Sequence, residues 1–266
     1  MTRNLRVEGH FGEYLQGTLG PRGPIALVTL PCAQTGVIAH HQPARQGLRV
    51  AGAEMSRPQV LSFVSSLGGK LTGHLRLRAL VAPGLGTGVS TARLLALARL
   101  SGWDGPPEML ARACVGFEGA SDPLMFDAPE RVLWASRMGQ ILQPMPALPR
   151  HEVIGGIWGA PQRTDARDAA FPDISDLVTD WAKADSLAVF AGLARESARR
   201  CLHLRGPLHD PTEALAKELG ALGWVMAHTG AMRGLIFAPG QVPARARATL
   251  RAAGMRGIVQ FKGGTR

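Results

Sequence analysis

Residues 83–92, PGLGTGVSTA, have the composition and spacing of a loop that binds phosphate groups. The glycines permit sharp turns and a close approach of the backbone to a ligand, and Ser90 or Thr91 stands where a helix is expected to begin. Residues 74–81 before the loop alternate between apolar and polar, which predicts a strand with one buried face. A strand, a glycine-rich loop and a helix N-terminus together present backbone N–H groups to phosphate oxygens. The predicted phosphate-binding residues are Gly84, Leu85, Gly86, Thr87, Gly88, Val89, Ser90 and Thr91.

Three other interpretations of this loop fit the residues less well. A Walker A loop ends in lysine followed by Ser or Thr, whereas Lys70 lies upstream of this loop. A dinucleotide fingerprint needs an acidic residue at the end of a second strand, but Asp104 lies in the turn-like GWDGPP. A serine hydrolase with Ser90 as nucleophile needs a glycine where Ala92 stands. The half-polar strand also favours an antiparallel sheet with helices on one side over a parallel sheet.

Two acidic residues follow the loop at the end of a predicted helix over residues 107–118. Glu118 and Asp122 are four positions apart, so they would lie on one face if the helix continued. Gly119 and Ser121 between them make a break in the helix plausible.

The chain resembles the GHMP kinases in three regions that occur in the family's order. Residues 83–92 match the phosphate loop at Gly86, Gly88, Ser90 and Ala92, with Thr87 and Val89 in place of the usual Leu and Ser. GHFGEYLQG, residues 9–17, resembles the N-terminal motif, most closely that of the L-threonine kinases of cobalamin biosynthesis. FEGASDPLMF, residues 117–126, matches the acidic motif in spacing, and residues 224–240 resemble the glycine-rich third motif.

This resemblance implies an enzyme that uses ATP and Mg²⁺ to phosphorylate a hydroxyl group, with L-threonine as the expected acceptor. Homoserine, a sugar or an isoprenoid alcohol remain open as acceptors. Ser90 and Glu118 would hold Mg²⁺, and Asp122 would be the general base. Glu13 and Gln16 would bond a substrate amine or hydroxyl, and His228, Thr229 and Gly230 carry over from the third motif as substrate-binding residues. Arg163 and Asp165 match a further polar element loosely, and His10 receives no role.

The resemblance implies an α+β fold of two domains, with a ribosomal protein S5 domain 2-like N-terminal domain and a ferredoxin-like C-terminal α/β sandwich. The proline-rich residues 143–149 place the boundary between residues 1–148 and 149–266. Sequence patterns also predict elements outside the motifs. They are strands at 24–31, 35–41 and 258–264, a hairpin at 130–142, and helices at 57–68, 185–205, 211–223 and 244–254.

The composition of the chain bears on whether the protein is disordered, bound to a membrane or bound to nucleic acid. With 45% hydrophobic and 19% charged residues, the 266-residue chain is expected to be globular. It has neither an apolar run of about eighteen residues nor a signal-peptide core, so we expect a cytoplasmic protein with no membrane partner. The net charge of +10 raises the alternative of a basic nucleic-acid-binding domain, but arginines occur along the whole chain and there is one tyrosine. We therefore expect a small-molecule substrate and no nucleic acid.

Overall fold

The structure is a computed structural model that describes residues 1–52, 55–162, 165, 167–228 and 230–264. Its ten-stranded sheet has the order β10-β7-β9-β8-β1-β2-β4-β3, and β5 and β6 branch from β2. The strands are β1 (Arg3–Thr18), β2 (Ile25–Gln42), β3 (Leu48–Ala51), β4 (Gly73–Ala79), β5 (Val132–Ala135), β6 (Gln140–Pro144), β7 (His151–Ile157), β8 (Gly223–Met226), β9 (Met232–Phe237) and β10 (Arg256–Gly263). The α-helices are α1 (Arg57–Ser66), α2 (Val89–Leu100), α3 (Pro107–Glu118), α4 (Ser175–Trp181), α5 (Leu187–Arg205), α6 (Thr212–Leu219) and α7 (Ala246–Ala252).

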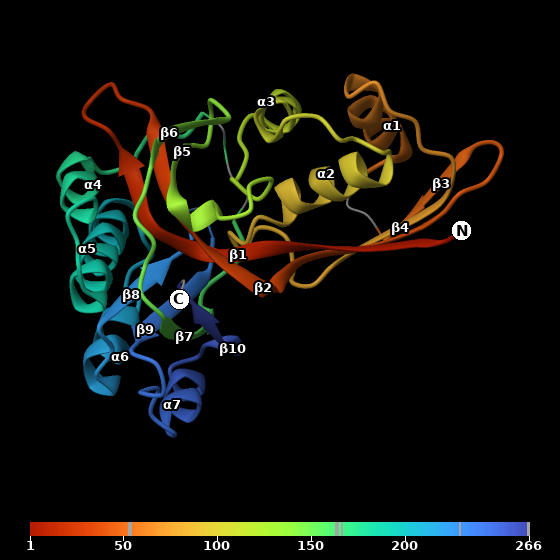
Figure 1. Cartoon of the computed structure of the whole chain (residues 1–266). Coiled ribbons are helices and arrows are strands. Elements are labelled where there is room, and N and C mark those ends of the chain that lie inside the picture. The colour runs from red at the N-terminus through yellow and green to blue at the C-terminus, as the bar shows by residue number, and fades with distance from the viewer. Residues whose placement is uncertain (53–54, 163–164, 166, 229, 265–266) are drawn as a thin grey trace.

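The long hairpin of β1 and β2 runs through the whole molecule and joins its two halves (Figure 1). The sequence predicted two separate strands at 24–31 and 35–41, whereas the structure has the single strand β2. The register with β1 shifts where Glu8 opposes Gly36 and Gly9 opposes Cys32. A bulge therefore absorbs the extra residues without ending the strand.

Helices α1, α2 and α3 lie on one side of β1, β2, β4 and β3 (Figure 1). The inner face of these strands supplies Val7, Val37, Leu75 and Leu77 to a core shared with α2. Almost every residue of α2 is buried. The expectation of an antiparallel sheet with helices on one side is confirmed for β4, which pairs antiparallel with β2, while the short β3 adds a parallel neighbour.

The second half of the chain adds β7 to β10 to the sheet and packs α5 against β1 and β8. Its core includes Phe11 and Tyr14 of β1 together with Val153, Trp181 and Phe190. Helix α4 has no counterpart in the sequence prediction, since seven residues carry too little of a helical period. The predicted α+β class is confirmed. Among the described helices, none has the length and apolar character to cross a membrane.

Candidate active site

A cavity of about 350 Å³ lies where the loop before α2 meets β1 and the segment after α3. Its lining includes the loop residues Gly84, Gly86, Thr87 and Gly88 and the first residues of α2. It also includes His10, Glu13, Glu118, Asp122 and His228, which come from three other parts of the chain. The sequence motifs that were predicted to act together therefore meet in one cavity.

The glycine loop ends at the uncapped N-terminus of α2. Gly84, Gly86 and Gly88 all have positive φ, and Gly88 is the N-cap residue, so the helix begins at Val89 and not at Ser90 or Thr91. No side chain caps this end. The first N–H groups of the helix are thus available to an anion, and the helix dipole favours negative charge there. Leu85, one of the predicted phosphate-binding residues, does not line the cavity, and its side chain is buried in the hydrophobic core.

Strand β1 packs directly against this loop. The His10 N–H donates to the Thr87 carbonyl at 3.1 Å. A Cβ on Gly9 would lie 2.4 Å from that same carbonyl oxygen, and a Cβ on Gly88 would lie 2.5 Å from Cδ2 of His10. Glycine at both positions therefore lets the N-terminal motif and the loop touch.

Ser90 and Glu118 form a pair of oxygen ligands at the start of α2. The Ser90 hydroxyl donates to Oε1 of Glu118 at 2.5 Å. Helix α3 ends at Glu118, with Gly119 in the left-handed conformation as its C-cap. Burial raises the pKa of Glu118, while the Ser90 hydroxyl and the charge of Arg93 partly offset this effect. A hydroxyl and a carboxylate beside a phosphate-binding helix end are hard oxygen donors of the kind Mg²⁺ prefers, so the residues present fit this ion.

Asp122 lines the cavity, but α3 does not continue as far as this residue. The chain leaves α3 at Gly119, and Thr91 then holds Asp122 from α2. The Thr91 hydroxyl donates to Oδ2 of Asp122 and accepts from the Asp122 N–H, both at 3.1 Å. The Ser121 N–H donates to the Ser136 carbonyl, and the Trp134 indole donates to the Ser121 carbonyl. These bonds hold the Asp122 carboxylate at Thr91, the residue that follows Ser90 in α2.

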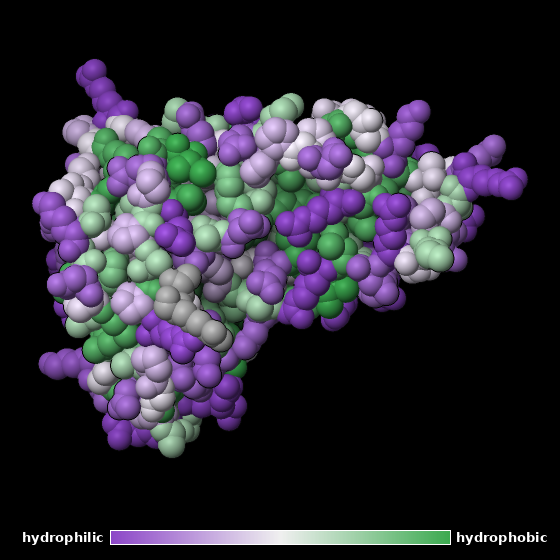
Figure 2. Space-filling view, in the orientation of Figure 1, coloured by the Kyte–Doolittle hydropathy of each residue, from purple (hydrophilic) through white to green (hydrophobic). Residues whose placement is uncertain are grey.

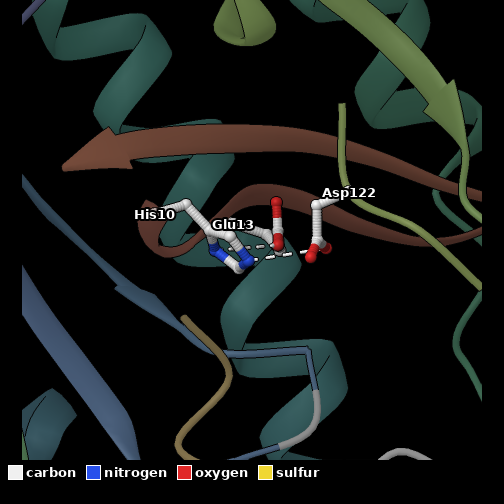
Figure 3. A group of neighbouring side chains, drawn as sticks. All are labelled: His10, Glu13 and Asp122. Atoms are coloured by element: carbon white, nitrogen blue, oxygen red, sulfur yellow. Dashed lines mark ion pairs between the residues drawn. The ribbon is translucent and has the colours of Figure 1, made fainter. Parts of the chain in front are cut away.

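Two buried residues, His10 and Glu13, form a cluster with the partly exposed Asp122 on the wall of the cavity (Figure 3). Residues three apart on a regular strand point to opposite faces, but the register of β1 shifts between His10 and Glu13, and Gly12 has a φ of 90°. His10 consequently lies between the acids, with Nδ1 3.4 Å from Glu13 and Nε2 3.4 Å from Asp122.

The charges of this cluster depend on one another. Burial lowers the pKa of His10, but the carboxylates of Asp122 and Glu13 outweigh it and raise the pKa to about 9. Burial raises the pKa of Asp122, yet His10 and Thr91 more than compensate and hold the pKa below its usual value. Burial raises the pKa of Glu13 to about 7 despite the charge of His10. Near neutral pH, an ionised Asp122 therefore faces a protonated His10.

The remaining residues that the family resemblance marked lie in different places. Gln16 does not line the cavity, because its side chain is directed into the protein core. It is fully buried there and donates to the Met226 carbonyl. Gly230 lies beneath the loop, where a Cβ would be 2.4 Å from the carbonyl carbon of Leu85, so its role is packing. His228 does line the cavity. Thr229 and Arg163 lie outside the described residues, and the Asp165 side chain is half exposed and paired with Arg167.

Solved structures with similar backbones are small-molecule kinases. Mevalonate kinase from Methanococcus jannaschii has a TM-score of 0.64 at 8% identity, covering 100% of this chain and 98% of its own. Homoserine kinase from Cytophaga hutchinsonii has a TM-score of 0.59 at 16% identity, covering 99% and 94%. A phosphotransferase described as related to coenzyme A biosynthesis has a TM-score of 0.63 at 14% identity, covering 99% and 96%. The chain has the GHMP kinase fold. No protein-family model and no curated protein sequence matches it.

Within this GHMP kinase fold, a stack of three side chains supports one wall of the cavity. The imidazole of His228 lies parallel to the Phe171 ring, with centroids 4.1 Å apart. The Arg205 guanidinium lies 4.0 Å from the centroid of the same ring, so the two must occupy opposite faces. Arg205 also pairs with Asp168. Burial lowers the pKa of His228 to about 3, assisted by the charge of Arg205, and Nδ1 of His228 is buried without a hydrogen-bond partner.

Sequence reasoning missed several residues that line this cavity. Arg93 lies one helical turn after Ser90, and this spacing on a predicted helix was an available signal. Ser136 and Arg137 come from the turn between β5 and β6, and no motif marks them. His10 occurs in the N-terminal motif, but only the bulge in β1 shows that it reaches Asp122.

Proposed function

We propose that this protein is a kinase that uses ATP and Mg²⁺ to phosphorylate the hydroxyl group of a small molecule. The observation that carries the proposal is the position of Asp122 at the uncapped start of α2. Asp122 is hydrogen-bonded to Thr91, and the preceding residue, Ser90, is hydrogen-bonded to Glu118. A phosphate site, a site for Mg²⁺ and an ionised carboxylate thus line the same cavity. The GHMP kinase fold supports this assignment.

Phosphoryl transfer requires positioning and charge stabilisation more than covalent chemistry from the protein. Backbone N–H groups from Gly86 to Ser90 would bind the phosphates of ATP, with Arg93 adding positive charge nearby. Ser90 and Glu118 would hold Mg²⁺, which neutralises charge on the phosphate oxygens when it is bound. The hydrogen bond from the Ser90 hydroxyl to Glu118 fits this role as a ligand and requires no nucleophilic role for Ser90.

Asp122 would orient the acceptor hydroxyl and take its proton. Its low pKa keeps it ionised, and the proton of His10 keeps the carboxylate directed into the cavity. A weakly basic carboxylate is sufficient as the proton acceptor when the phosphoryl group leaves ATP before the acceptor hydroxyl loses its proton.

We propose L-threonine as the acceptor. Both carboxylate oxygens of Glu13 are buried without a hydrogen-bond partner, which suits a substrate ammonium group. Arg137 lines the same cavity and could bind a substrate carboxylate. An amino acid with a side-chain hydroxyl offers an opposite charge to each of these two residues, whereas a sugar offers none.

Product detection tests this proposal. The protein is incubated with Mg-ATP and separately with L-threonine, L-homoserine, L-serine, mevalonate and a hexose, and phosphorylated products are identified by mass spectrometry. We expect O-phospho-L-threonine to form fastest. Preferred phosphorylation of homoserine would keep the kinase and replace the acceptor. Absence of any phosphorylated product, with ATP hydrolysis no faster than in buffer, would overturn the kinase assignment.

The hydrolase alternative receives no support from the geometry around Ser90. Its hydroxyl donates to the carboxylate of Glu118. The two histidines that line the cavity contact other groups, since His10 pairs with Glu13 and Asp122 and His228 stacks on Phe171. The type of serine hydrolase considered for this loop uses a histidine as the base that activates its serine.

A further inference from the structure

Positive charge is concentrated in the first part of this chain. Residues 1–100 contain eleven Lys and Arg residues and only three Asp and Glu residues, although they make up well under half of the sequence. The remaining residues are close to electrical balance. A strong asymmetry of this kind indicates an anionic partner for the basic part.

The fold gathers part of this charge on one uncovered sheet surface. Helices α1, α2 and α3 cover only one side of β1, β2, β4 and β3, and Figure 1 shows no helix on the opposite side of these strands. Side chains on that opposite side alternate with the buried ones and are mostly exposed. Figure 2 shows hydrophilic residues interspersed with hydrophobic ones over the part of the molecule that holds β3 and β4. We call this surface the basic sheet face; its cationic and titratable residues are Arg6, Arg49, Arg76, Arg78, His40 and His74.

Strand register places these arginines next to one another. Arg6 pairs with Ile38 and Ile38 pairs with Arg78, so the two arginines are two strands apart, about 10 Å across the sheet. Arg76 and Arg78 lie on the same face of β4, about 7 Å apart. Arg49 opposes His74, diagonally next to Arg76. The ion pairs within the described part of the chain include none of these arginines.

The face has little compensation for its charge. Among the described residues of these four strands, the acidic side chain on this face is that of Glu8. Glu8 lies opposite Gly36 of β2, next to the point where the register of β1 and β2 shifts. Like charges across neighbouring strands are destabilising in the isolated protein. A partner that brings carboxylates to this face would relieve that repulsion.

We propose that the basic sheet face docks an acidic protein surface. The face has no exposed Phe, Tyr or Trp among its described residues, so it lacks the stacking groups of single-strand nucleic-acid binders. Figure 1 also shows no helix among the described residues of this face that could enter the major groove of a duplex. Its cations are arginines and not lysines, and arginine is enriched in protein interfaces and binds carboxylates in a bidentate manner.

This proposal is independent of the proposed kinase activity. The cavity lies beside α2, on the helix-covered side of these strands, whereas Arg76 and Arg78 point to the opposite side. Substitutions on the basic sheet face should leave any phosphorylation of threonine unchanged. Loss of binding without loss of activity, or the reverse, therefore separates the two proposals.

The test uses poly-L-glutamate as the probe and measures binding by fluorescence anisotropy at several salt concentrations. The double variant Arg76→Glu/Arg78→Glu removes the centre of the face. The control Arg22→Glu/Arg195→Glu makes the same change in net charge at two other exposed arginines. Circular dichroism and a thermal melt verify that both variants fold.

We expect the face variant to weaken binding at least tenfold and the control by twofold or less, with a smaller salt dependence for the face variant. Equal weakening by the two variants would show a response to net charge alone and would overturn the docking surface. Tighter binding to duplex DNA or to phosphatidylserine vesicles than to poly-L-glutamate, with the same dependence on Arg76 and Arg78, would overturn the assignment to an acidic protein.

Discussion

Asp122 is the side chain on which the proposed reaction depends most directly. Replacing Asp122 with Asn keeps the size of the side chain and a possible bond to Thr91 but removes the group that takes the proton. We expect kcat to fall by about two to four powers of ten, with the KM for ATP little changed. Steady-state kinetics with the preferred acceptor provide the measurement. Asp127→Asn, an exposed acid five residues on, is the control, and near-normal turnover of the Asp122 variant would remove this residue from the mechanism.

His10 should make stability depend on pH on the alkaline side. Burial lowers its pKa, but the neighbouring acids raise it to about 9, above its ordinary value of 6.5. A raised pKa means that the stabilisation is fully present below pH 6.5 and is lost as the pH rises through about 9. Since each pKa unit corresponds to about 1.4 kcal/mol, we expect a loss of up to about 3 kcal/mol in unfolding free energy. Urea titrations from pH 6 to 10 should show this loss in the native protein and not in His10→Gln.

The Phe171 ring should act on the acceptor through His228. Replacing Phe171 with Leu keeps an apolar side chain but removes the flat surface between His228 and Arg205. If neutral His228 bonds the acceptor, losing its alignment should raise the acceptor KM about three- to tenfold, as expected for one hydrogen bond. The KM for ATP should stay within twofold. An unchanged acceptor KM would assign the stack to packing alone.

At the scale of elements, the contact between β1 and the glycine loop explains why position 88 requires glycine. Alanine at this position would need a left-handed conformation at a φ of 67° and would place Cβ 2.5 Å from His10. Gly102, after the other end of α2, also has positive φ but has nothing within 4 Å of a Cβ. Both substitutions incur the backbone cost of about 1 to 2 kcal/mol, and only Gly88→Ala adds the clash.

We therefore expect Gly88→Ala to lower the unfolding free energy by at least about 2 kcal/mol more than Gly102→Ala, because the clash must move the loop or His10. Denaturant titration gives the difference. The binding of Mg-ATP, followed by a thermal shift, should weaken only in Gly88→Ala. Equal effects of the two variants would show that the loop accommodates the extra methyl group.

Helices and strands with strong patterns were predicted from the sequence, because their periodicity is local. The structure has helices α1, α3, α5, α6 and α7 close to their predicted positions. Glu118 was correctly assigned to the end of a helix. The prediction was wrong where a long-range contact decides the outcome: β2 continues through residues 32–36 because its pairing with β1 resumes after a bulge in β2.

At the scale of the molecule, the two predicted domains share a hydrophobic core. Phe11, Tyr14 and Leu15 of β1 pack with Trp181 and Phe190 from the second half. We expect residues 1–148 and 149–266 to unfold together, because separating them would expose this apolar surface to water. Calorimetry of the full chain should show one transition with equal calorimetric and van't Hoff enthalpies. Two resolved transitions would show that each half is stable alone.

The sequence by itself determined the local chemistry of this protein: a glycine loop before a helix, an acid at the end of the next helix and the alternation of the strands. These features depend on neighbouring residues, whose backbone preferences act over a few positions. Only the tertiary structure decided that Thr91 holds Asp122, that a bulge turns both His10 and Glu13 towards the cavity, and that Gln16 faces the core. It also decided that arginines far apart in the chain share one open face, because strand register sets which side chains become neighbours.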